Sequence, residues 1–264
     1  MASGMSQLRD KLVTRCSLVV SPVDVWTRRM PSGLSVLLED IARKPVRKSD
    51  GTYLFLDVPA GVYTLSVKSP MFMPYTEQID LSALSPLAPV VTVPLLPGPG
   101  YAYPAAATAA LVRIVDEAGT PIAGADIEAY ATEDAAARAR VAQDGLKAGD
   151  SIIAAGSFKG KTFAGEFLLL RDAENEQLLS VAEMLPGDAL RLERPIAYSF
   201  RRGALFMPAI VTRSGLDGTA LLPFRGSLPP QFAVKAKVKA GGKAVIAELQ
   251  AKAGEVAKLR TIVL

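Results

Sequence analysis

Residues 49–70, SDGTYLFLDVPAGVYTLSVKSP, decide the fold of this chain. A short strand, a Pro-Gly corner and a second strand follow one another in this stretch. In the second strand Tyr63, Leu65 and Val67 fall on one side, and the polar residues between them fall on the other. Because side chains alternate between the two faces of a strand, this pattern predicts one half-buried hairpin of a small β-sandwich.

A related stretch returns near the C-terminus. Residues 216–224 (LDGTALLPF) again place Asp-Gly-Thr before an apolar strand, and residues 231–240 (QFAVKAKVKA) alternate apolar residues with Lys235, Lys237 and Lys239. We expect these lysines on the water-facing side of the strand, where charge also discourages edge-to-edge pairing. The chain is therefore predicted to hold two such modules in a row.

Proline and glycine mark the boundary between the two modules. Residues 97–107 (PGPGYAYPAAA) contain three prolines and two glycines, which interrupt helices and strand pairing and predict a semi-stiff linker. We therefore expect an N-terminal arm at residues 1–12, one β-sandwich at residues 13–96 and a second at residues 108–264. The predicted fold class is all-β, with two tandem immunoglobulin-like or transthyretin-like sandwiches.

The second module is enlarged by an insertion at residues 131–213. Within it, residues 132–144 (TEDAAARARVAQD) are rich in alanine, open with acidic residues and precede Gly145, which predicts a helix capped by Thr132. Extra strands are expected after this helix, at residues 163–170, 177–183, 189–193 and 205–212.

The order of turns and strands resembles the carboxypeptidase regulatory-like, or transthyretin-like, β-sandwich family. The first copy of the pattern is carried by Asp50, Gly51, Tyr53, Phe55, Pro59, Gly61, Tyr63, Leu65 and Val67. The second copy is carried by residues 112–115, Gly119, Pro121, Gly124, Ala125, Asp217, Gly218 and Thr219. It departs from the family in the insertion and in residues 227–230 (SLPP), where the Pro-x-Gly corner would stand. The resemblance implies an architecture and no activity, because these residues form turns and fill the core.

The first module, over residues 18–75, is also similar to domains found with bacterial phage-tail-like contractile injection systems. That resemblance implies a non-catalytic structural subunit that binds other protein subunits in a larger particle. The first fifteen residues carry four charges and no apolar run of signal-peptide length, and no later run approaches the ~20 residues of a membrane span. We therefore expect cytoplasmic assembly, with release as part of a particle, and no membrane partner.

The composition excludes several kinds of chemistry. The chain has no histidine and one cysteine, Cys16, which rules out histidine-dependent triads, histidine-ligated zinc and cysteine clusters. It contains no phosphate-binding loop or calcium loop, and its net charge of +4 lacks the concentrated basic stripe of a nucleic-acid binder. We predict no cofactor, no metal, no nucleic-acid partner and no enzymatic activity. The alternative is an enzyme with two converging carboxylates in the insertion.

Two loops of the first module carry the candidate partner-binding residues. The apolar loop at residues 71–75 contributes Met71, Phe72, Met73 and Tyr75, joined by Trp26 from the preceding loop. The basic candidates are Arg28 and Arg29. The alternative interpretation is that the apolar residues cap the open end of the sandwich core and that the basic residues simply face water.

A second alternative is a carbohydrate- or cell-surface-binding module. Sugar platforms need exposed, coplanar aromatic rings, and the candidates for such a platform are Trp26, Tyr75, Tyr101 and Tyr103. Isopeptide cross-links of the kind formed in adhesin sandwiches need an asparagine or aspartate beside a lysine. The one asparagine, Asn175, is expected in a turn, which disfavours such a link.

Overall fold

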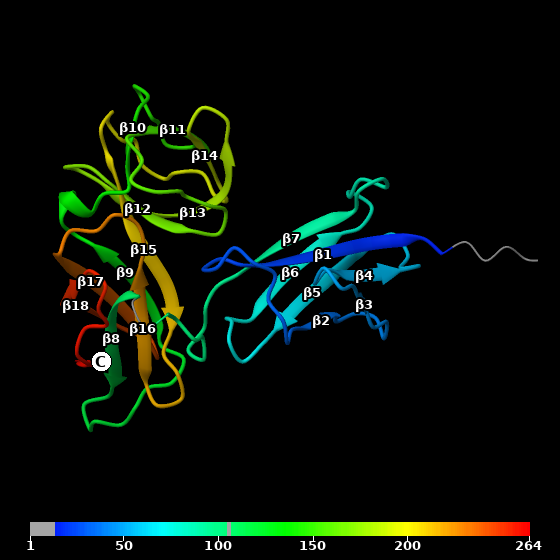
Figure 1. Ribbon diagram of the computed structural model, residues 1–264, viewed down its shortest axis with the longest axis horizontal. Coiled ribbons are helices and arrows are strands. Elements are labelled where there is room, and N and C mark those ends of the chain that lie inside the picture. Colours follow the sequence, from blue (N-terminus) through cyan, green and yellow to red (C-terminus); the bar gives the residue numbers. More distant parts are fainter. Residues whose placement is uncertain (1–13, 105–106) are drawn as a thin grey trace, which may run out of the picture. The chain divides into compact units, whose positions relative to one another are not determined.

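A computed structural model describes residues 14–104 and 107–264, and nearly every regular element in them is a β-strand (Figure 1). Within these ranges there is no α-helix, and the helical turn at Asp134–Ala136 is a 3₁₀ helix. The all-β expectation is confirmed. The N-terminal arm expected at residues 1–12 lies outside the described residues.

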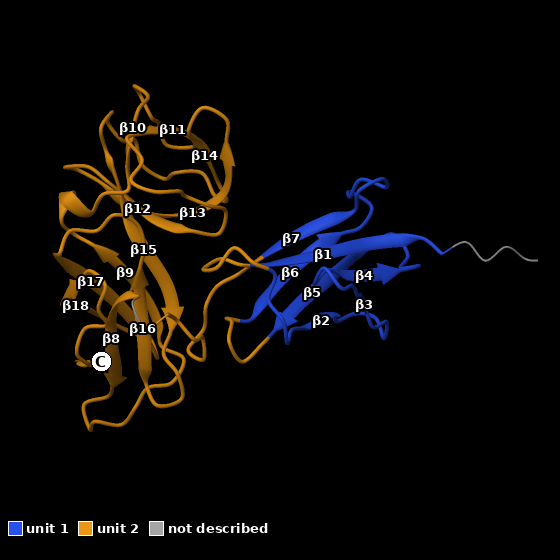
Figure 2. Ribbon diagram, in the orientation of Figure 1, with its two compact units in different colours: residues 1–23, 30–68, 74–93 blue, residues 24–29, 69–73, 94–264 orange. Residues whose placement is uncertain are grey.

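Contacts between residues divide the chain into two compact units (Figure 2). The described part of unit 1 comprises residues 14–23, 30–68 and 74–93, and unit 2 comprises residues 24–29, 69–73 and 94–264, of which 105–106 are not described. This division does not follow the Pro/Gly linker, because two loops that precede the linker are counted with unit 2. The sequence-derived domain boundaries stay a prediction.

Unit 1 is built from two sheets. The first has the order β3 (Val46–Arg47), β4 (Tyr53–Leu56), β1 (Cys16–Asp24) and β7 (Val90–Leu95), and the last residues of β1 and β7 are counted with unit 2. The second has the order β2 (Ser35–Leu38), β5 (Val62–Lys68) and β6 (Tyr75–Asp80). β1 continues through Pro22 to Asp24. β7 lies at the edge of its sheet, a position that tolerates its Pro94.

The two strands predicted in residues 49–70 form, but the prediction that they pair as a hairpin is wrong. β4 pairs with β1 and β3, whereas β5 pairs with β2 and β6 in the other sheet, so the Pro-Gly corner connects the two sheets. The Asp-Gly turn and the alternation in β5 follow the prediction, with one exception. Asp50 Oδ1 accepts hydrogen bonds from Thr52 N at 2.9 Å and Thr52 Oγ1 at 2.7 Å, and Gly51 takes a φ of +90°, which holds the turn. Leu65 is fully buried in the second strand. The exception is Ser66, which was expected to face water but is 1% exposed.

The first half of unit 2 is a sandwich of two facing sheets around one core. One sheet has the order β16 (Thr219–Phe224), β8 (Thr108–Val115) and β19 (Arg260–Val263). The other contains β15 (Leu205–Arg213), β9 (Asp126–Ala131), β17 (Gln231–Ala240) and β18 (Lys243–Lys252). In β17 the apolar positions at 232, 234, 236 and 238 are buried, while the lysines between them are at least partly exposed, as the alternation predicted.

The second half of unit 2 is a ring of six strands that shares β15 with the sandwich. β10 (Ala139–Val141) pairs with both β11 (Ile152–Gly156) and β15. The ring is completed by β14 (Ala189–Leu192), β13 (Glu176–Leu185) and β12 (Phe167–Arg171). It encloses a second apolar core that includes Ile153, Leu168 and Phe206. The extra strands expected in the insertion are therefore present.

The helix predicted at residues 132–144 is wrong. Only Asp134–Ala136 form a helical turn, and residues 139–141 are in β10. Ala136 and Ala137 are buried in the sandwich core. Ala139 and Val141 are buried on either side of exposed Arg140, which is the alternation of a strand. The alanines of this segment pack closely between strands. The helix was predicted because alanine has a high helix propensity.

Candidate functional site

Asp24 organises the loop at residues 24–29 of unit 2. Its side chain is 5% exposed, and its Oδ1 accepts a hydrogen bond from Trp26 N at 2.7 Å. Its Oδ2 accepts from Thr27 Oγ1 and from Tyr101 Oη, both at 2.6 Å. The backbone closes the loop, since Arg28 N donates to Asp24 O at 2.8 Å. One buried carboxylate thus fixes the direction of the side chains that follow it.

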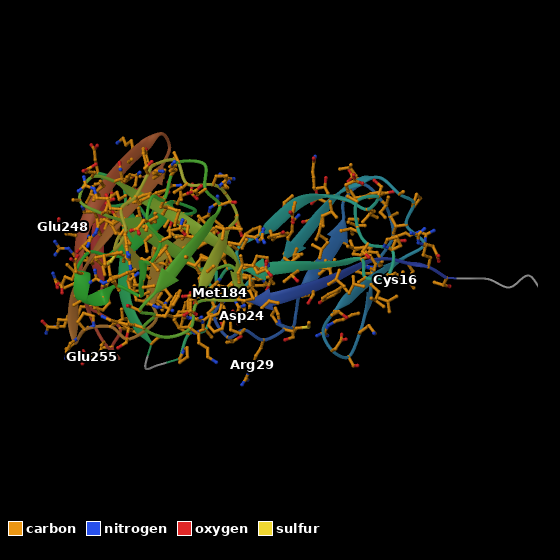
Figure 3. All side chains as sticks on the ribbon, turned by 90° about the horizontal axis from the view of Figure 1, so that it is seen from above. Cys16, Asp24, Arg29, Met184, Glu248 and Glu255 are labelled. Atoms are coloured by element: carbon orange, nitrogen blue, oxygen red, sulfur yellow. The ribbon has the colours of Figure 1, made fainter. Side chains whose placement is uncertain are left out.

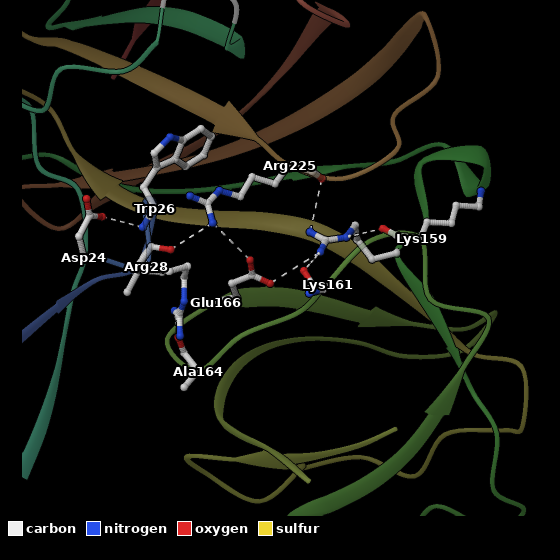
Figure 4. Close-up of polar contacts among 10 residues, drawn as sticks. Asp24, Trp26, Arg28, Lys159, Lys161, Ala164, Glu166 and Arg225 are labelled. Atoms are coloured by element: carbon white, nitrogen blue, oxygen red, sulfur yellow. Dashed lines mark hydrogen bonds and ion pairs between the residues drawn. The ribbon is translucent and has the colours of Figure 1, made fainter. Parts of the chain in front are cut away.

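Trp26 lies between an aromatic ring and a guanidinium group. The indole is edge-on to Tyr103, with ring centroids 5.0 Å apart, and the Arg225 Cζ lies 3.9 Å from the indole centroid. Arg225 Nη1 also donates to Val25 O at 3.1 Å (Figure 4). Burial lowers the pKa of Arg225, and the negative charges of Glu166 and Asp24 oppose that effect. This is a desolvated cation–π contact, the stronger kind.

Glu166 is the carboxylate at the centre of this cluster. It is 8% exposed, its Oε1 lies 3.6 Å from Arg225 Nη1, and its Oε2 lies 3.8 Å from Arg138 Nη2 (Figure 4). These distances exceed a hydrogen bond, and neither oxygen has a hydrogen-bond partner among the described residues. Burial therefore raises the pKa of Glu166, although Arg138 and Arg225 act in the opposite direction.

Arg138 is held by the backbone. It is 3% exposed, and its guanidinium donates to Lys159 O at 3.2 Å, Arg225 O at 3.4 Å and Lys161 O at 2.7 Å. Gly226 leaves room for it: a Cβ there would come within 2.5 Å of Arg138 Cδ. A buried arginine that binds three carbonyl oxygens fixes the loops that supply them.

Like Arg138, Arg28 donates a hydrogen bond from its guanidinium to a backbone carbonyl. Its Nη1 donates to Ala164 O at 2.8 Å, and its Cζ lies 4.5 Å from the centroid of the Phe163 ring. Burial lowers the pKa of Arg28, with Glu166 and Asp24 again opposing. Arg28, Arg138 and Arg225 thus share one buried carboxylate, and we call these four residues, with Trp26, the arginine cluster.

The structure divides the candidate partner-binding residues into packed and exposed ones. Trp26 and Arg28 belong to the arginine cluster. Phe72 is 4% exposed and its ring lies 5.5 Å from that of Tyr101, while Met73 N donates to Leu96 O at 2.9 Å. Phe72 thus packs within unit 2, and the alternative in which the apolar loop caps the core of the first module stays a prediction.

Of the three remaining candidates, two are exposed residues of unit 2 and the third belongs to unit 1. Arg29 is exposed and extends away from the ribbon in Figure 3, and Met71 is 36% exposed. Tyr75 begins β6 of unit 1, and its hydroxyl forms a hydrogen bond with Glu77. Met71 and Tyr75, which were expected in one apolar loop, are thus counted with different units.

Sequence reasoning missed three members of the cluster: Arg138, Glu166 and Arg225. Glu166 carried the clearest signal, because it opens the apolar run EFLLL at residues 166–170, where an unpaired charge is costly. Arg138 stood in the segment predicted as a helix, where a charged residue is unremarkable. Their partners are separated by many residues in the sequence, so no local pattern joins them.

The aromatic candidates do not form a sugar platform. The planes of Trp26 and Tyr103 are inclined by 89°, and those of Tyr101 and Tyr103 by 56°. The three rings pack against one another, and Tyr101 donates its hydroxyl to Asp24. A coplanar, open surface of the kind that stacks on a sugar ring is therefore not made by these three side chains.

The carboxylates of the insertion are engaged in turns and ion pairs. Asp172 accepts hydrogen bonds from the backbone N–H groups of Glu174, Asn175 and Arg201, at 2.9, 2.9 and 3.2 Å. Partial burial raises its pKa, but these bonds lower it by more, so the net shift is downward. Glu174 pairs with Arg201, and Asn175 Nδ2 donates to Ser199 O.

A cavity of about 60 Å³ lies beside the arginine cluster, lined by Trp26, Tyr103, Glu166, Arg225 and mainly apolar neighbours. Across the described residues, histidine, cysteine, aspartate and glutamate side chains nowhere gather in threes with a geometry suited to a metal ion. The same part of the chain has no helix with the length and hydrophobicity that a membrane crossing requires.

Comparisons with known proteins give only distant likenesses. No family model and no curated protein matches the chain. A streptococcal ancillary pilin is 10% identical, with 95% of this chain and 61% of that chain covered and a TM-score of 0.26, so the chain spans about three fifths of that pilin. A shaft pilin of Lactobacillus rhamnosus GG is 12% identical over 95% of this chain and 96% of that one, with a TM-score of 0.26.

The major pilin subunit of Bacillus cereus is 10% identical over 90% of this chain and 67% of that one, with a TM-score of 0.25. TM-scores this low carry no argument.

Proposed function

We propose that this protein is a non-catalytic structural subunit that binds other protein subunits in a larger assembly. One observation carries the proposal: the side chains best suited to chemistry are used to hold the fold. Glu166 is surrounded by three arginines, and Arg138 binds three backbone carbonyls. A carboxylate that acts as acid or base must reach a substrate, whereas Glu166 is 8% exposed.

The binding surface that we propose includes Arg29 and Met71. Both are exposed, and both belong to loops whose other members are fixed inside unit 2. A cation and a methionine on a pre-ordered loop suit a protein contact, because arginine and methionine are enriched at protein interfaces and little entropy is lost when an ordered loop binds. The residues that hold these two loops in place are Trp26, Arg28, Phe72 and Met73.

The finer proposal concerns the kind of assembly. The resemblance of residues 18–75 to domains of phage-tail-like contractile injection systems supports a particle of that type, assembled in the cytoplasm and released from it. Under this proposal Tyr75 and the basic residues of unit 1, Arg43, Lys44, Arg47 and Lys48, supply a further contact with an acidic partner. All four basic residues are exposed.

The experiment is to tag the full-length protein in its native host, fractionate the lysate by size and identify what co-sediments. The proposal expects recovery in a particle-sized fraction with a reproducible set of protein subunits. Recovery as a lone monomer, with no such assembly at any growth stage, would overturn it.

A matched pair of double variants tests the surface itself. Arg29→Glu combined with Met71→Ser is expected to move the protein from the particle to the monomer fraction. Arg194→Glu combined with Leu216→Ser changes an exposed arginine and an apolar side chain that is 95% exposed elsewhere in unit 2, and is expected to leave the assembly intact. Equal losses from both pairs would contradict the proposed surface.

A further inference from the structure

The strand β18 ends the nine-stranded sheet of unit 2 and pairs only with β17 in the described chain. It is ten residues long, contains no proline, and pairs with β17 in unbroken register from Lys243 to Lys252. Proteins usually protect such an edge with a proline, a bulge or a covering loop, because unpaired N–H and C=O groups are a template for another strand. This edge has neither a proline nor a bulge, and the segment at residues 257–260 borders a hollow that Glu248 and Gln250 also line.

The turn that precedes β18 determines which backbone N–H and C=O groups of the strand point away from β17. Gly241 and Gly242 form a two-residue loop, both with positive φ, so Ala240 and Lys243 are the hydrogen-bonded pair that closes the hairpin. Odd-numbered residues therefore direct their N–H and C=O toward β17, and even-numbered residues direct theirs outward. The end of the strand agrees, because Ala253 N donates to Pro230 O on the β17 side.

The outward-directed residues carry two charges of opposite sign. Among residues 244, 246, 248, 250 and 252, Glu248 and Lys252 are charged, and both are exposed. Glu248 forms no ion pair within the described chain, and Lys252 pairs at 2.6 Å with Glu255, which is also at the surface of unit 2 (Figure 3). The two charges are four residues apart and centred on Gln250.

We propose that β18 pairs with β18 of a second copy of this chain, antiparallel and about a two-fold axis through Gln250. In this register Glu248 of each copy lies opposite Lys252 of the other, and the even-numbered residues, whose backbone groups point away from β17, meet each other. Lys252 O also accepts a hydrogen bond from Glu255 N at 3.2 Å within its own chain, which leaves Glu248 and Gln250 as the residues with no such bond. A shift by two residues would place Glu248 opposite Gln250 or Gly254 and lose both ion pairs, and a shift by four could place Glu248 opposite Glu248 of the second copy, which is unfavourable. A shift by one residue would pair outward-directed groups with groups already bonded to β17.

This inference names one partner of the proposed structural subunit, but it rests on the strand edge and not on Arg29 or Met71. The overlap at residues 248–252 is short, so a weak, reversible dimer is expected, at the low end of specific interfaces. It is therefore tested on the purified full-length protein, without the host, and either proposal can fail while the other stands.

The first test is charge reversal, with sedimentation equilibrium as the readout. Glu248→Lys and Lys252→Glu each place like charges opposite one another at two symmetric positions, and each is expected to weaken dimerisation about tenfold. The double variant restores opposite charges and is expected to recover most of the loss. Thermal unfolding checks that each variant is folded. A protein that stays monomeric at all concentrations, or dimerisation unchanged by the single variants, would overturn the proposal.

The second test is a cross-link, which remains informative if the charges contribute little. In a Cys16→Ser background, Gln250→Cys should form an intermolecular disulfide on mild oxidation, because Cα atoms of a hydrogen-bonded antiparallel pair are about 5.5 Å apart. Ala244→Cys is the control: it lies on the same outward side, but the two copies of residue 244 would be about 40 Å apart. Equal cross-linking of both variants, or none at residue 250, would rule out this register.

Discussion

The guanidinium of Arg225 lies over the indole of Trp26, with Cζ 3.9 Å from the ring centroid, although the two residues are far apart in the sequence. Arg225 Nη1 simultaneously donates to Val25 O and faces Glu166 Oε1. Trp26 therefore covers a buried ion pair and gives it a desolvated environment, in which each charge depends on the other.

Removing this cover should destabilise unit 2. Trp26→Ala is expected to lower the free energy of unfolding by about 2–4 kcal/mol, because it deletes a large packed ring and exposes the Arg225–Glu166 pair to water. Urea unfolding followed by circular dichroism measures this loss. Tyr198→Ala is the control, since Tyr198 is 50% exposed, and should stay within about 0.5 kcal/mol of the unchanged protein. Equal losses in the free energy of unfolding at the two positions would mean that the indole does not stabilise the Arg225–Glu166 pair.

Gly165 allows the close approach of the 24–29 loop. Its φ is +81°, and a Cβ there would lie 2.7 Å from Val25 Cγ2 and 2.9 Å from Pro94 Cβ. Gly187 has a similar φ of +75° but nothing within 4 Å of its Cβ position. Gly187→Ala should cost about 1 kcal/mol from backbone strain alone, and Gly165→Ala about 2–3 kcal/mol more from the overlap. The difference between the thermal melts of the two variants measures the stability lost to steric overlap at residue 165. Equal losses in the two variants would contradict the overlap.

The sequence predicted features that depend on neighbouring residues. The Asp-Gly-Thr repeat is a repeat in structure too: Asp217 Oδ1 accepts from Thr219 N at 3.0 Å and from Thr219 Oγ1 at 2.7 Å, as Asp50 does with Thr52. Gly218 has a positive φ as Gly51 does. A turn of this kind is encoded by three consecutive residues, so it can be identified without knowledge of the rest of the chain.

Features that depend on distant residues could not be predicted in this way. β10 closes the ring through its pairing with β11 and β15, and nothing in ARV at residues 139–141 indicates two partners. The arginine cluster joins residues 26, 28, 138, 166 and 225, whose side chains meet only because four separate loops converge. Alanine misled the helix prediction because small residues suit both helices and crowded strands.

Arg138 should be the most sensitive arginine of the cluster. Arg138→Met keeps most of the side-chain volume but leaves three carbonyl oxygens without their donor and Glu166 without one of its ion-pair partners, so we expect a loss of at least about 3 kcal/mol in the free energy of unfolding. Arg191→Met breaks the exposed pair with Glu183 and should cost at most about 1 kcal/mol. Urea unfolding of both variants gives the comparison. A loss at Arg138 no larger than that at Arg191 would show that the carbonyls find other donors.

Glu166 should give the protein a pH-dependent stability with a definite sign. Burial raises the pKa of Glu166 above its ordinary value of 4.5, so the folded state binds this proton more tightly than the unfolded state. Its contribution to stability is then fully present below the unfolded-state pKa and is lost as pH rises through the folded-state pKa. Glu166→Gln removes the titration while it retains the shape of the side chain.

The measurement is urea unfolding of the unchanged protein and of Glu166→Gln between pH 7 and pH 4.5, followed by the fluorescence of Trp26, the only tryptophan of the chain. Because all other titrating groups are common to both proteins, their effects largely cancel in the difference. We expect the unchanged protein to gain stability relative to Glu166→Gln as pH falls across this window. A difference independent of pH, or one of opposite sign, would show that the arginines outweigh burial and keep Glu166 ionised in the fold.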